Sequence, residues 1–368
     1  MGVETPQQKL KVCLVTISLA GGGAERSTAV LSQMLDSKGY AVTTAVVVDA
    51  VDYPYAGTLY KIGSVKKSMG FLSSLANMQR FRSFLKQQKF DLIIDNRSRP
   101  QNYKESIYSG YAYKGFNVLY VVRSFKLETY FPQSHSLAKK MIDRSLGVIG
   151  VSKAIATEVS ERYQTDKAQH IYNPLPLKWI TEQAGIETQK GRYIMAMGRL
   201  YDDVKNYSLL IDGYAASKLP KENIQLYLMG DGPDKEKLHN KVKSLGLEEH
   251  VQFLAFNPNP YPVLQAALCS VLSSHYEGFP RAVIESLAVG TPVVSVDCQS
   301  GPKEIITDGH NGLLVPNYDV DRLAEALNNI IFDQSLLSTT TSNAKASVAH
   351  LDTEVIAQQW DTIIQELL

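Results

Sequence analysis

Short apolar runs alternate with amphipathic segments along most of this 368-residue chain. The runs that we interpret as strands span residues 11–17, 42–48, 90–94, 118–122 and 147–151 in the first half, and 193–197, 225–229, 251–254, 267–272 and 293–296 in the second. They are short and rich in Val, Ile and Leu, as in strands that are buried on both faces of a sheet. Strands that alternate with helices predict an α/β fold with parallel sheets and ligands at the carboxyl ends of the strands.

The chain is long enough for two domains of ordinary size. We expect the boundary at Asn173-Pro174, because the residue before a proline disfavours helix. The predicted domains are residues 1–172 and 173–352. Apolar residues at helical spacing follow in a final segment, 353–368, which we expect to be a helix: Ile356, Trp360, Ile363 and Leu367.

The bulk composition predicts a globular cytoplasmic protein. Hydrophobic residues make up 44% of the chain and charged residues 20%. Cys13, Cys269 and Cys298 show no disulfide or zinc spacing, and we expect Cys13 and Cys269 to be buried free thiols. The first nine residues are polar and no run of about eighteen apolar residues occurs, which predicts neither an export signal nor a membrane span.

Charge is distributed unevenly between the two halves. Residues 1–172 contain 23 Lys and Arg against 13 Asp and Glu, a net charge of +10, whereas residues 173–368 have a net charge of −9. The basic residues gather in four groups: Lys61, Lys66 and Lys67; Arg80, Arg82, Lys86 and Lys89; Arg97, Arg99 and Lys104; and Lys139, Lys140 and Arg144. The groups are either solvated helix faces or a surface for an anionic membrane or a polyprenyl-diphosphate acceptor. We expect no nucleic acid partner, because no recognition motif accompanies the charge.

Two glutamates, Glu277 and Glu285, flank a predicted helix start at Pro280. Proline fits the first turn of a helix, and the free N–H groups there suit a phosphate or a polar sugar. We expect Glu277, with Gly278 and Phe279, on a loop facing a ligand, and Glu285 within the helix, where its carboxylate could accept hydrogen bonds from a ribose. The alternative is that both glutamates are ordinary surface charges.

Two basic residues follow the predicted strand 193–197. Arg199 and Lys205 could neutralise the two phosphoryl groups of a diphosphate, or be plain surface charges. After the first strand, Gly21-Gly22-Gly23 lets the backbone approach a phosphate or an acceptor closely, although turn formation alone also explains it. Its spacing differs from the dinucleotide fingerprint, and Glu25 beside it fits a helix-start interaction.

The second half resembles the retaining glycosyltransferases of family 4, which have the GT-B fold of two facing Rossmann-like domains. The resemblance covers residues 193–330 and depends on five segments: Met197–Leu200 with Lys205-Asn206, Leu228–Pro233, Glu277 to Glu285, Gly290–Val294 and Asp308–Pro316. In the first half only residues 21–26 fit the pattern clearly. The resemblance implies that the last helix packs on the first domain, which would bind the acceptor, whereas the second would bind the nucleotide-sugar donor.

The resemblance also implies a reaction and roles for residues. Arg199 and Lys205 match the family's diphosphate clamp, Glu277 would orient the sugar hydroxyls and Glu285 would contact the ribose. Transfer would retain the anomeric configuration, with the leaving diphosphate accepting the proton of the acceptor. We expect no metal and no cofactor. The donor would be a UDP-linked hexose or N-acetylhexosamine, and the acceptor a glycan or a polyprenyl-diphosphate-linked saccharide at the inner face of the plasma membrane.

Further donor contacts are expected from two loops, at Ser300, Gly301, Pro302 and Lys303 and at Asn257, with Gly22 and Gly23 in the first domain. The Gly-Pro pair could also be a plain turn. Many relatives carry a histidine where this chain has Arg123 and Ser124, and either residue could replace it; His135 is a weaker candidate. Two other functions stay open, a sugar-nucleotide epimerase of the same architecture and a non-catalytic partner subunit. The exact donor, the acceptor, the linkage and the oligomeric state are not predicted.

Overall fold

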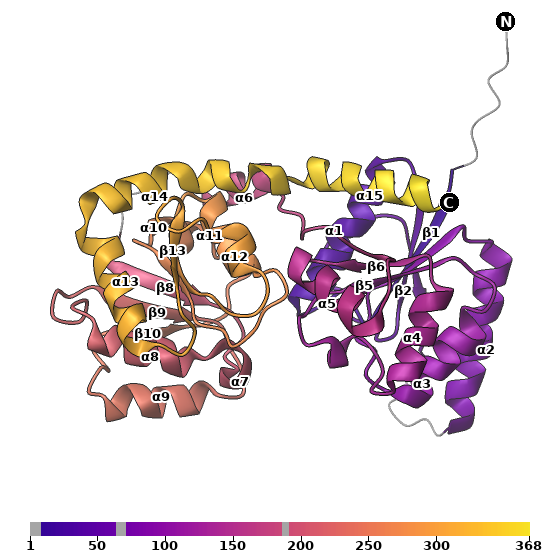
Figure 1. Cartoon of the computed structure of the whole chain (residues 1–368), viewed down its shortest axis with the longest axis horizontal. Helices are drawn as coiled ribbons and strands as arrows, with labels where there is room; N and C mark the ends of the chain where they lie inside the picture. The colour runs from indigo at the N-terminus through magenta and orange to yellow at the C-terminus, as the bar shows by residue number, and fades with distance from the viewer. Residues whose placement is uncertain (1–8, 64–70, 186–190) are drawn as a thin grey trace, which may run out of the picture. The chain divides into compact units, whose positions relative to one another are not determined.

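The computed structural model describes residues 9–63, 71–185 and 191–368 (Figure 1). The chain divides into two compact units, residues 1–174 with 353–368 and residues 175–352. Lys66 and Lys67 of the first basic group fall outside the described residues.

The N-terminal unit is built on a seven-stranded parallel sheet in the order β3-β2-β1-β4-β5-β6-β7. The strands are β1 (Lys11–Thr16), β2 (Ala41–Val46), β3 (Thr58–Lys61), β4 (Leu92–Asp95), β5 (Val118–Val122), β6 (Gly147–Gly150) and β7 (Ala168–His170). The helices are α1 (Gly23–Ser37), α2 (Phe71–Gln88), α3 (Asn102–Ile107), α4 (His135–Arg144), α5 (Lys153–Tyr163) and α15 (Thr353–Leu367), with a π turn over Tyr108–Ala112 and a 3-10 turn over Leu127–Thr129.

The C-terminal unit has a six-stranded parallel sheet in the order β10-β9-β8-β11-β12-β13. Its strands are β8 (Tyr193–Met197), β9 (Gln225–Met229), β10 (Val251–Leu254), β11 (Ser270–Leu272), β12 (Val293–Val296) and β13 (Gly312–Val315). Its helices are α6 (Leu177–Ala184), α7 (Asp202–Lys205), α8 (Tyr207–Ala216), α9 (Lys235–Ser244), α10 (Tyr261–Ala266), α11 (Arg281–Ala288), α12 (Pro302–Ile305), α13 (Val320–Phe332) and α14 (Gln334–Ser347), followed by a 3-10 turn over Ala349–Leu351.

The predicted α/β class with two parallel sheets is confirmed. Ten predicted strands occur within a few residues of their expected positions, whereas β3, β7 and β13 were missed. β3 and β7 are short edge strands with partly exposed residues, so they lack the continuous apolar run that identifies a central strand. The predicted strand 267–272 is shortened to three residues, although Ala267 and Cys269 before it are buried.

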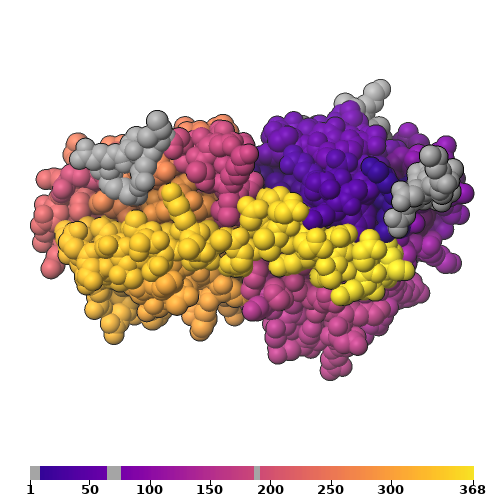
Figure 2. Space-filling model, turned by 90° about the horizontal axis from the view of Figure 1, so that it is seen from above, coloured from indigo at the N-terminus to yellow at the C-terminus, as the bar shows by residue number. Residues whose placement is uncertain are grey.

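The last helix, α15, packs against α1 within the N-terminal unit, as the resemblance implied. Figure 2 shows it in yellow beside the indigo start of the chain. Trp360 is buried, and two polar contacts add to the packing: Tyr40 donates a hydrogen bond to Asp361 at 2.6 Å, and Lys38 pairs with Glu354 at 2.8 Å. Ile363, which we expected in the buried stripe, is only half-buried, and Ile364 is buried in its place.

Candidate functional site

The order of the strands locates a crevice in the C-terminal unit. The chain runs outward from β8 to β9 and β10, and then returns to the other side of β8 with β11, β12 and β13. The loops after β8 and β11 therefore diverge to opposite faces of the sheet, and in such sheets ligands bind in the gap between them. Arg199 and Lys205 follow β8, and Glu277 follows β11.

Helix α7 places Lys205 at this crevice, and Asp202 anchors the start of the helix. The buried Asp202 carboxylate accepts hydrogen bonds from Ser208 Oγ at 2.6 Å and from Lys237 Nζ at 2.8 Å. Burial raises the pKa of this carboxyl, but the hydrogen bonds outweigh burial, and the pKa lies below its usual range. Asn206 ends α7 in a left-handed conformation and caps α8 through Leu209 N–H. The position of Lys205 is thus fixed by its neighbours in the chain.

Lys205 and Glu277 meet across the crevice. The distance from Lys205 Nζ to Glu277 Oε1 is 2.6 Å, and Ser274 Oγ donates to the same carboxylate oxygen at 2.7 Å. The two charged side chains are 24% and 12% exposed. The loop after β11 is also tied to α7, because His275 N–H donates to the Val204 carbonyl at 2.9 Å. Glu277 is therefore not the solvated loop charge of the alternative interpretation.

The loop after β12 is joined to the Glu277 loop. Ser300 Oγ donates to the Gly278 carbonyl at 2.7 Å, and Glu277 N–H donates to the Gln299 carbonyl at 3.1 Å. Gly301 has a φ of +99°, and a Cβ there would lie 2.4 Å from Pro280 Cδ, so only glycine fits. Lys303 is exposed and pairs with Asp297 at 3.5 Å. Of the predicted donor-loop residues, Ser300 and Gly301 thus lie beside Gly278 and Pro280.

Helix α11 begins at Arg281, so the prediction that Pro280 occupies the first turn was wrong by one residue. Pro280 precedes the helix with an extended ψ of 109°, which its ring permits. Phe279 is buried beside it. Glu285 is 4% exposed and accepts hydrogen bonds from Arg281 Nη2 at 2.8 Å and Nε at 3.1 Å. It is not a surface charge, and its contact with a ribose stays a prediction.

The glycines of the segment 228–233 bring the loops after β8 and β9 together. A Cβ on Gly230 would lie 2.0 Å from the Gly198 carbonyl oxygen, and one on Gly232 would lie 2.3 Å from the Leu200 carbonyl oxygen. Gly198 N–H donates to the Met229 carbonyl at 3.0 Å. This contact shapes the backbone that carries the exposed side chain of Arg199.

Two titratable groups beside the Lys205–Glu277 pair are held neutral. Burial raises the pKa of Tyr207, and the negative charges of Glu277 and Asp202 add to this effect. Burial, with the charge of Glu277, also raises the pKa of the Cys298 thiol to about 12, although Lys205 opposes the shift. Cys13, Cys269 and Cys298 are all buried free thiols, as predicted for the first two.

Asn257 lies in the loop after the edge strand β10, two strands from β8. It is exposed, and its side-chain oxygen accepts a hydrogen bond from Asn259 N–H at 2.9 Å. Nothing in this geometry joins it to the Lys205–Glu277 pair, and its contact with a base stays a prediction.

The N-terminal unit has a crevice of the same kind, since its sheet order reverses between β1 and β4. Gly21, Gly22 and Gly23 follow β1, and α1 begins at Gly23. Gly21 has a φ of +81°, and a Cβ on Gly22 would lie 2.2 Å from Glu25 Oε2. Glu25 thus folds back over the helix start, as expected, and the left-handed φ of Gly21 favours glycine there.

Arg123 follows β5 and lies in a network of amides. Its Nη1 donates to Asn173 Oδ1 at 2.8 Å and its Nη2 to Asn96 Oδ1 at 2.9 Å. Ser124 Oγ accepts from Lys126 N–H at 3.2 Å. His135 lies on the surface at the start of α4, with Nε2 3.0 Å from the Arg162 carbonyl oxygen. Sequence reasoning did not single out Asn96, which directly follows β4.

Arg97 and Arg99 are buried ionic residues, so assigning them to a solvated or membrane-facing basic surface was wrong. Asp95 lies 2.7 Å from Arg97 and 3.5 Å from Arg99, and Arg97 also pairs with Glu105 at 3.1 Å. Burial raises the pKa of Asp95, but the two arginines outweigh it and lower the pKa below its usual range. Burial raises the pKa of Glu105 despite Arg97. The cluster thus lies at the end of β4, directly beside Asn96 in the chain.

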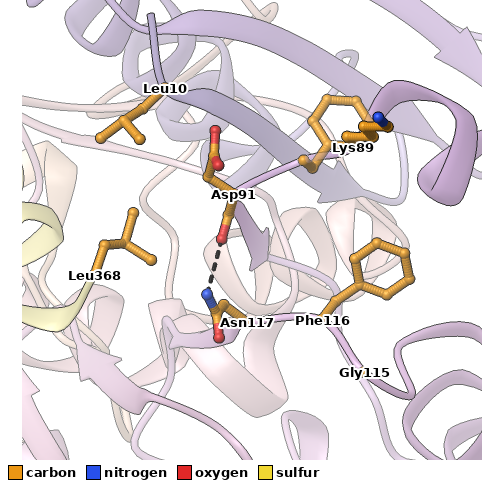
Figure 3. Close-up of a pocket in the computed structure, with 8 residues that line it drawn as sticks. Leu10, Lys89, Asp91, Gly115, Phe116, Asn117 and Leu368 are labelled. Carbon is orange, nitrogen blue, oxygen red and sulfur yellow. Dashed lines mark hydrogen bonds between the residues drawn. The ribbon is translucent and has the colours of Figure 1, made fainter. Parts of the chain in front are cut away.

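A hollow of about 480 Å³ lies at the opposite end of the N-terminal sheet (Figure 3). Leu10, Asp91 and Asn117 in its wall directly precede β1, β4 and β5, and Asn117 Nδ2 donates to the Asp91 carbonyl at 3.1 Å. Because ligands of parallel sheets bind at the carboxyl ends, this hollow is not the candidate site.

Within residues 9–63, 71–185 and 191–368, no group of three or more His, Cys, Asp or Glu side chains could hold a metal ion. In the same described ranges, no helix is both long and apolar enough to cross a membrane.

The architecture is that of the GT-B glycosyltransferases. HepE of Anabaena, solved in complex with UDP, is 20% identical, and its alignment covers 97% of this chain and 100% of that chain with a TM-score of 0.76.

Residues 178–347 match the family model described as "Glycosyl transferases group 1". Two curated bacterial relatives align with the chain. The N-acetylgalactosamine-N,N'-diacetylbacillosaminyl-diphospho-undecaprenol 4-alpha-N-acetylgalactosaminyltransferase of Campylobacter jejuni is 33% identical over 193 residues, 52% of each protein. The lipopolysaccharide 1,6-galactosyltransferase of Salmonella typhimurium is 26% identical over 269 residues, 72% of each protein. The chain spans about half or less of the length of several other curated relatives.

Proposed function

We propose that the protein is a retaining glycosyltransferase of family 4 that transfers a hexose or N-acetylhexosamine from a UDP-sugar to a glycan or lipid-linked saccharide in bacterial glycan synthesis. The observation that carries this proposal is the meeting of Lys205 and Glu277 at the switch point of the C-terminal sheet, 2.6 Å apart. A cation for a diphosphate and a carboxylate for sugar hydroxyls are the two groups that a nucleotide sugar requires there. The names of the relatives, which transfer N-acetylgalactosamine and galactose, support the sugar class.

In this proposal Arg199 and Lys205 bind the diphosphate and stabilise the charge that develops as it leaves. Glu277 accepts hydrogen bonds from the sugar, and Glu285 accepts them from the ribose. The bond from the anomeric carbon to the diphosphate breaks with its electron pair on the diphosphate. The acceptor oxygen bonds to the same face of that carbon, and its proton passes to a diphosphate oxygen. No metal takes part.

A thermal-shift panel of nucleoside diphosphates and nucleotide sugars tests the donor site. A ligand at 100 times its Kd stabilises the native state by about 2.7 kcal/mol. We expect UDP and one UDP-sugar to raise the melting temperature, and Lys205→Gln to reduce the shift. Lys241→Gln is the matched control, because Lys241 forms a similar pair with Asp212 at 2.7 Å on helices α9 and α8. Equal shifts in both variants would refute the donor site.

Turnover separates the proposed reaction from the other two candidates. Incubation of the protein with the UDP-sugar alone should give no epimer, and an epimer would favour the epimerase. Glu285→Ala should abolish glycan assembly, whereas unchanged assembly would favour a non-catalytic subunit. Exhaustive chelation should leave turnover intact; loss of turnover that only Mg²⁺ or Mn²⁺ restores would reject metal independence.

We further propose peripheral contact of the N-terminal unit with anionic lipid. Basic and aromatic side chains are exposed on its helices α2 and α3 and on the π turn. Lys104 lies 5.8 Å from the ring of Tyr103, and Arg82 lies 5.1 Å from that of Tyr111. Tyr103 and Tyr111 are 61% and 45% exposed, and such mixed surfaces suit a membrane interface. Sedimentation with phosphatidylglycerol vesicles should exceed that with phosphatidylcholine vesicles and decline with salt.

A further inference from the structure

The pairing of Lys205 with Glu277 places opposite charges where the proposed function needs a free cation. Both groups are partly buried, and Ser274 Oγ holds the carboxylate oxygen that contacts Lys205. The other carboxylate of the motif, Glu285, is already engaged by Arg281. Tyr207 and Cys298, which lie near the pair, are neutral because their pKa values are raised. The charge of Lys205 is therefore balanced mainly by Glu277.

We propose that Glu277 shares Lys205 with the donor diphosphate and thereby weakens the binding of free nucleoside diphosphate relative to nucleotide sugar. This inference rests on the proposed function of the site. A diphosphate that enters can draw Lys205 away from Glu277, which leaves the carboxylate unpaired. Otherwise it binds beside the intact pair, in which the Glu277 carboxylate already neutralises the charge of Lys205. In both cases the carboxylate opposes the binding of the diphosphate.

The sugar of the donor changes this balance. Its hydroxyl groups can donate hydrogen bonds to Glu277 and replace the contact that Lys205 leaves. Free UDP has no group at that position, so the carboxylate loses a partner and gains none, which is costly for a partly buried charge. Glu277 thus favours the donor over the leaving nucleotide and promotes release of the product.

Titration calorimetry with UDP, and with the UDP-sugar selected by the thermal-shift panel, measures this effect. Glu277→Gln should bind UDP about tenfold tighter, because Lys205 then contacts the diphosphate without sharing its charge with a carboxylate, and one such charged contact corresponds to about that factor. Its affinity for the UDP-sugar should stay the same or fall. Asp212→Asn is the matched control, because it removes a carboxylate from a lysine pair elsewhere in the same unit, and both affinities should stay unchanged.

A second variant and a second background make the result decisive. Glu277→Asp keeps the charge but shortens the side chain, so its affinity for UDP should lie between those of the wild type and Glu277→Gln. In a Lys205→Gln background the gain from Glu277→Gln should shrink severalfold. Weaker UDP binding by Glu277→Gln, or an undiminished gain without Lys205, would overturn the sharing of Lys205. Failure of the wild type to bind any nucleotide would instead overturn the proposed function.

Discussion

Gly230→Ala tests whether the loops after β8 and β9 depend on their close backbone contact. Gly230 has a φ of +148°, and an added Cβ would lie 2.0 Å from the Gly198 carbonyl oxygen. A side chain at such a φ costs about 1–3 kcal/mol, and overpacking adds about 1–3 kcal/mol. The stiffer unfolded chain offsets about 0.4–1 kcal/mol. We therefore expect the free energy of unfolding to fall by about 1–5.5 kcal/mol.

The matched control is Gly246→Ala. Gly246 has a φ of +66°, but a Cβ there would meet no atom within 4 Å. The left-handed backbone costs about 1–2 kcal/mol, and the stiffer unfolded chain offsets part of this cost. The free energy of unfolding should therefore fall by about 0–1.5 kcal/mol. The difference between the two variants isolates the collision with the Gly198 carbonyl.

Each unit contains one of the two tryptophans, which makes the assay specific. Trp179 lies in the C-terminal unit and Trp360 in the N-terminal unit. In a Trp360→Phe background, urea unfolding followed by fluorescence reports the C-terminal unit through Trp179. If Gly230→Ala lost no more stability than Gly246→Ala, the backbone contact would not hold these loops. Because Arg199 follows Gly198 directly, we also expect Gly230→Ala to weaken UDP binding.

Three further predictions concern charge and burial. Asp95→Asn should destabilise the N-terminal unit by about 3–5 kcal/mol, because it leaves two buried arginines with less compensation; urea unfolding followed through Trp360 in a Trp179→Phe background checks this. The folded-state pKa of Asp95 is lowered, so the stability that its carboxylate contributes is present above about pH 4 and is lost as the pH falls towards the folded-state pKa. The free energy of unfolding of Asp95→Asn should therefore vary less with acid pH than that of the wild type. An equal variation would contradict the ionic role of Asp95. Asp202→Asn should weaken UDP binding severalfold by loosening α7, and unchanged affinity would show that Lys205 is positioned without it. Cys298 should react with iodoacetamide at pH 8 only after unfolding, because burial raises its pKa to about 12, and rapid alkylation of the native protein would contradict that burial.

The central strands and the positions of the site loops could be predicted because both are local properties of the chain. An apolar run such as Val293–Val296 identifies a buried strand wherever it lies in the fold, and the polar residues after it must lie at its carboxyl end. Ser152 and Asp319 belong to the residue types that favour helix starts, and each accepts a hydrogen bond from the N–H three residues ahead. Such signals need no knowledge of the rest of the chain.

The partners of the site residues could not be predicted, because they depend on which strands are neighbours. Lys205 and Glu277 are 72 residues apart and meet only because β8 lies beside β11. The spacing of Arg97 and Arg99 gave no signal that both would turn inward toward Asp95, two and four residues earlier in the chain. Solvation normally keeps arginine at the surface, and only paired carboxylates such as Asp95 and Glu105 overcome that preference.

The two crevices hold their basic residues in chemically different ways. In the C-terminal unit Glu277 balances the charge of Lys205, whereas in the N-terminal unit the side-chain amides of Asn96 and Asn173 accept hydrogen bonds from Arg123. A carboxylate partner reduces the attraction for any anion and makes binding depend on what else the ligand offers, here a sugar. Amide partners orient a guanidinium without reducing its charge. Selectivity among nucleotide ligands should therefore arise at Glu277.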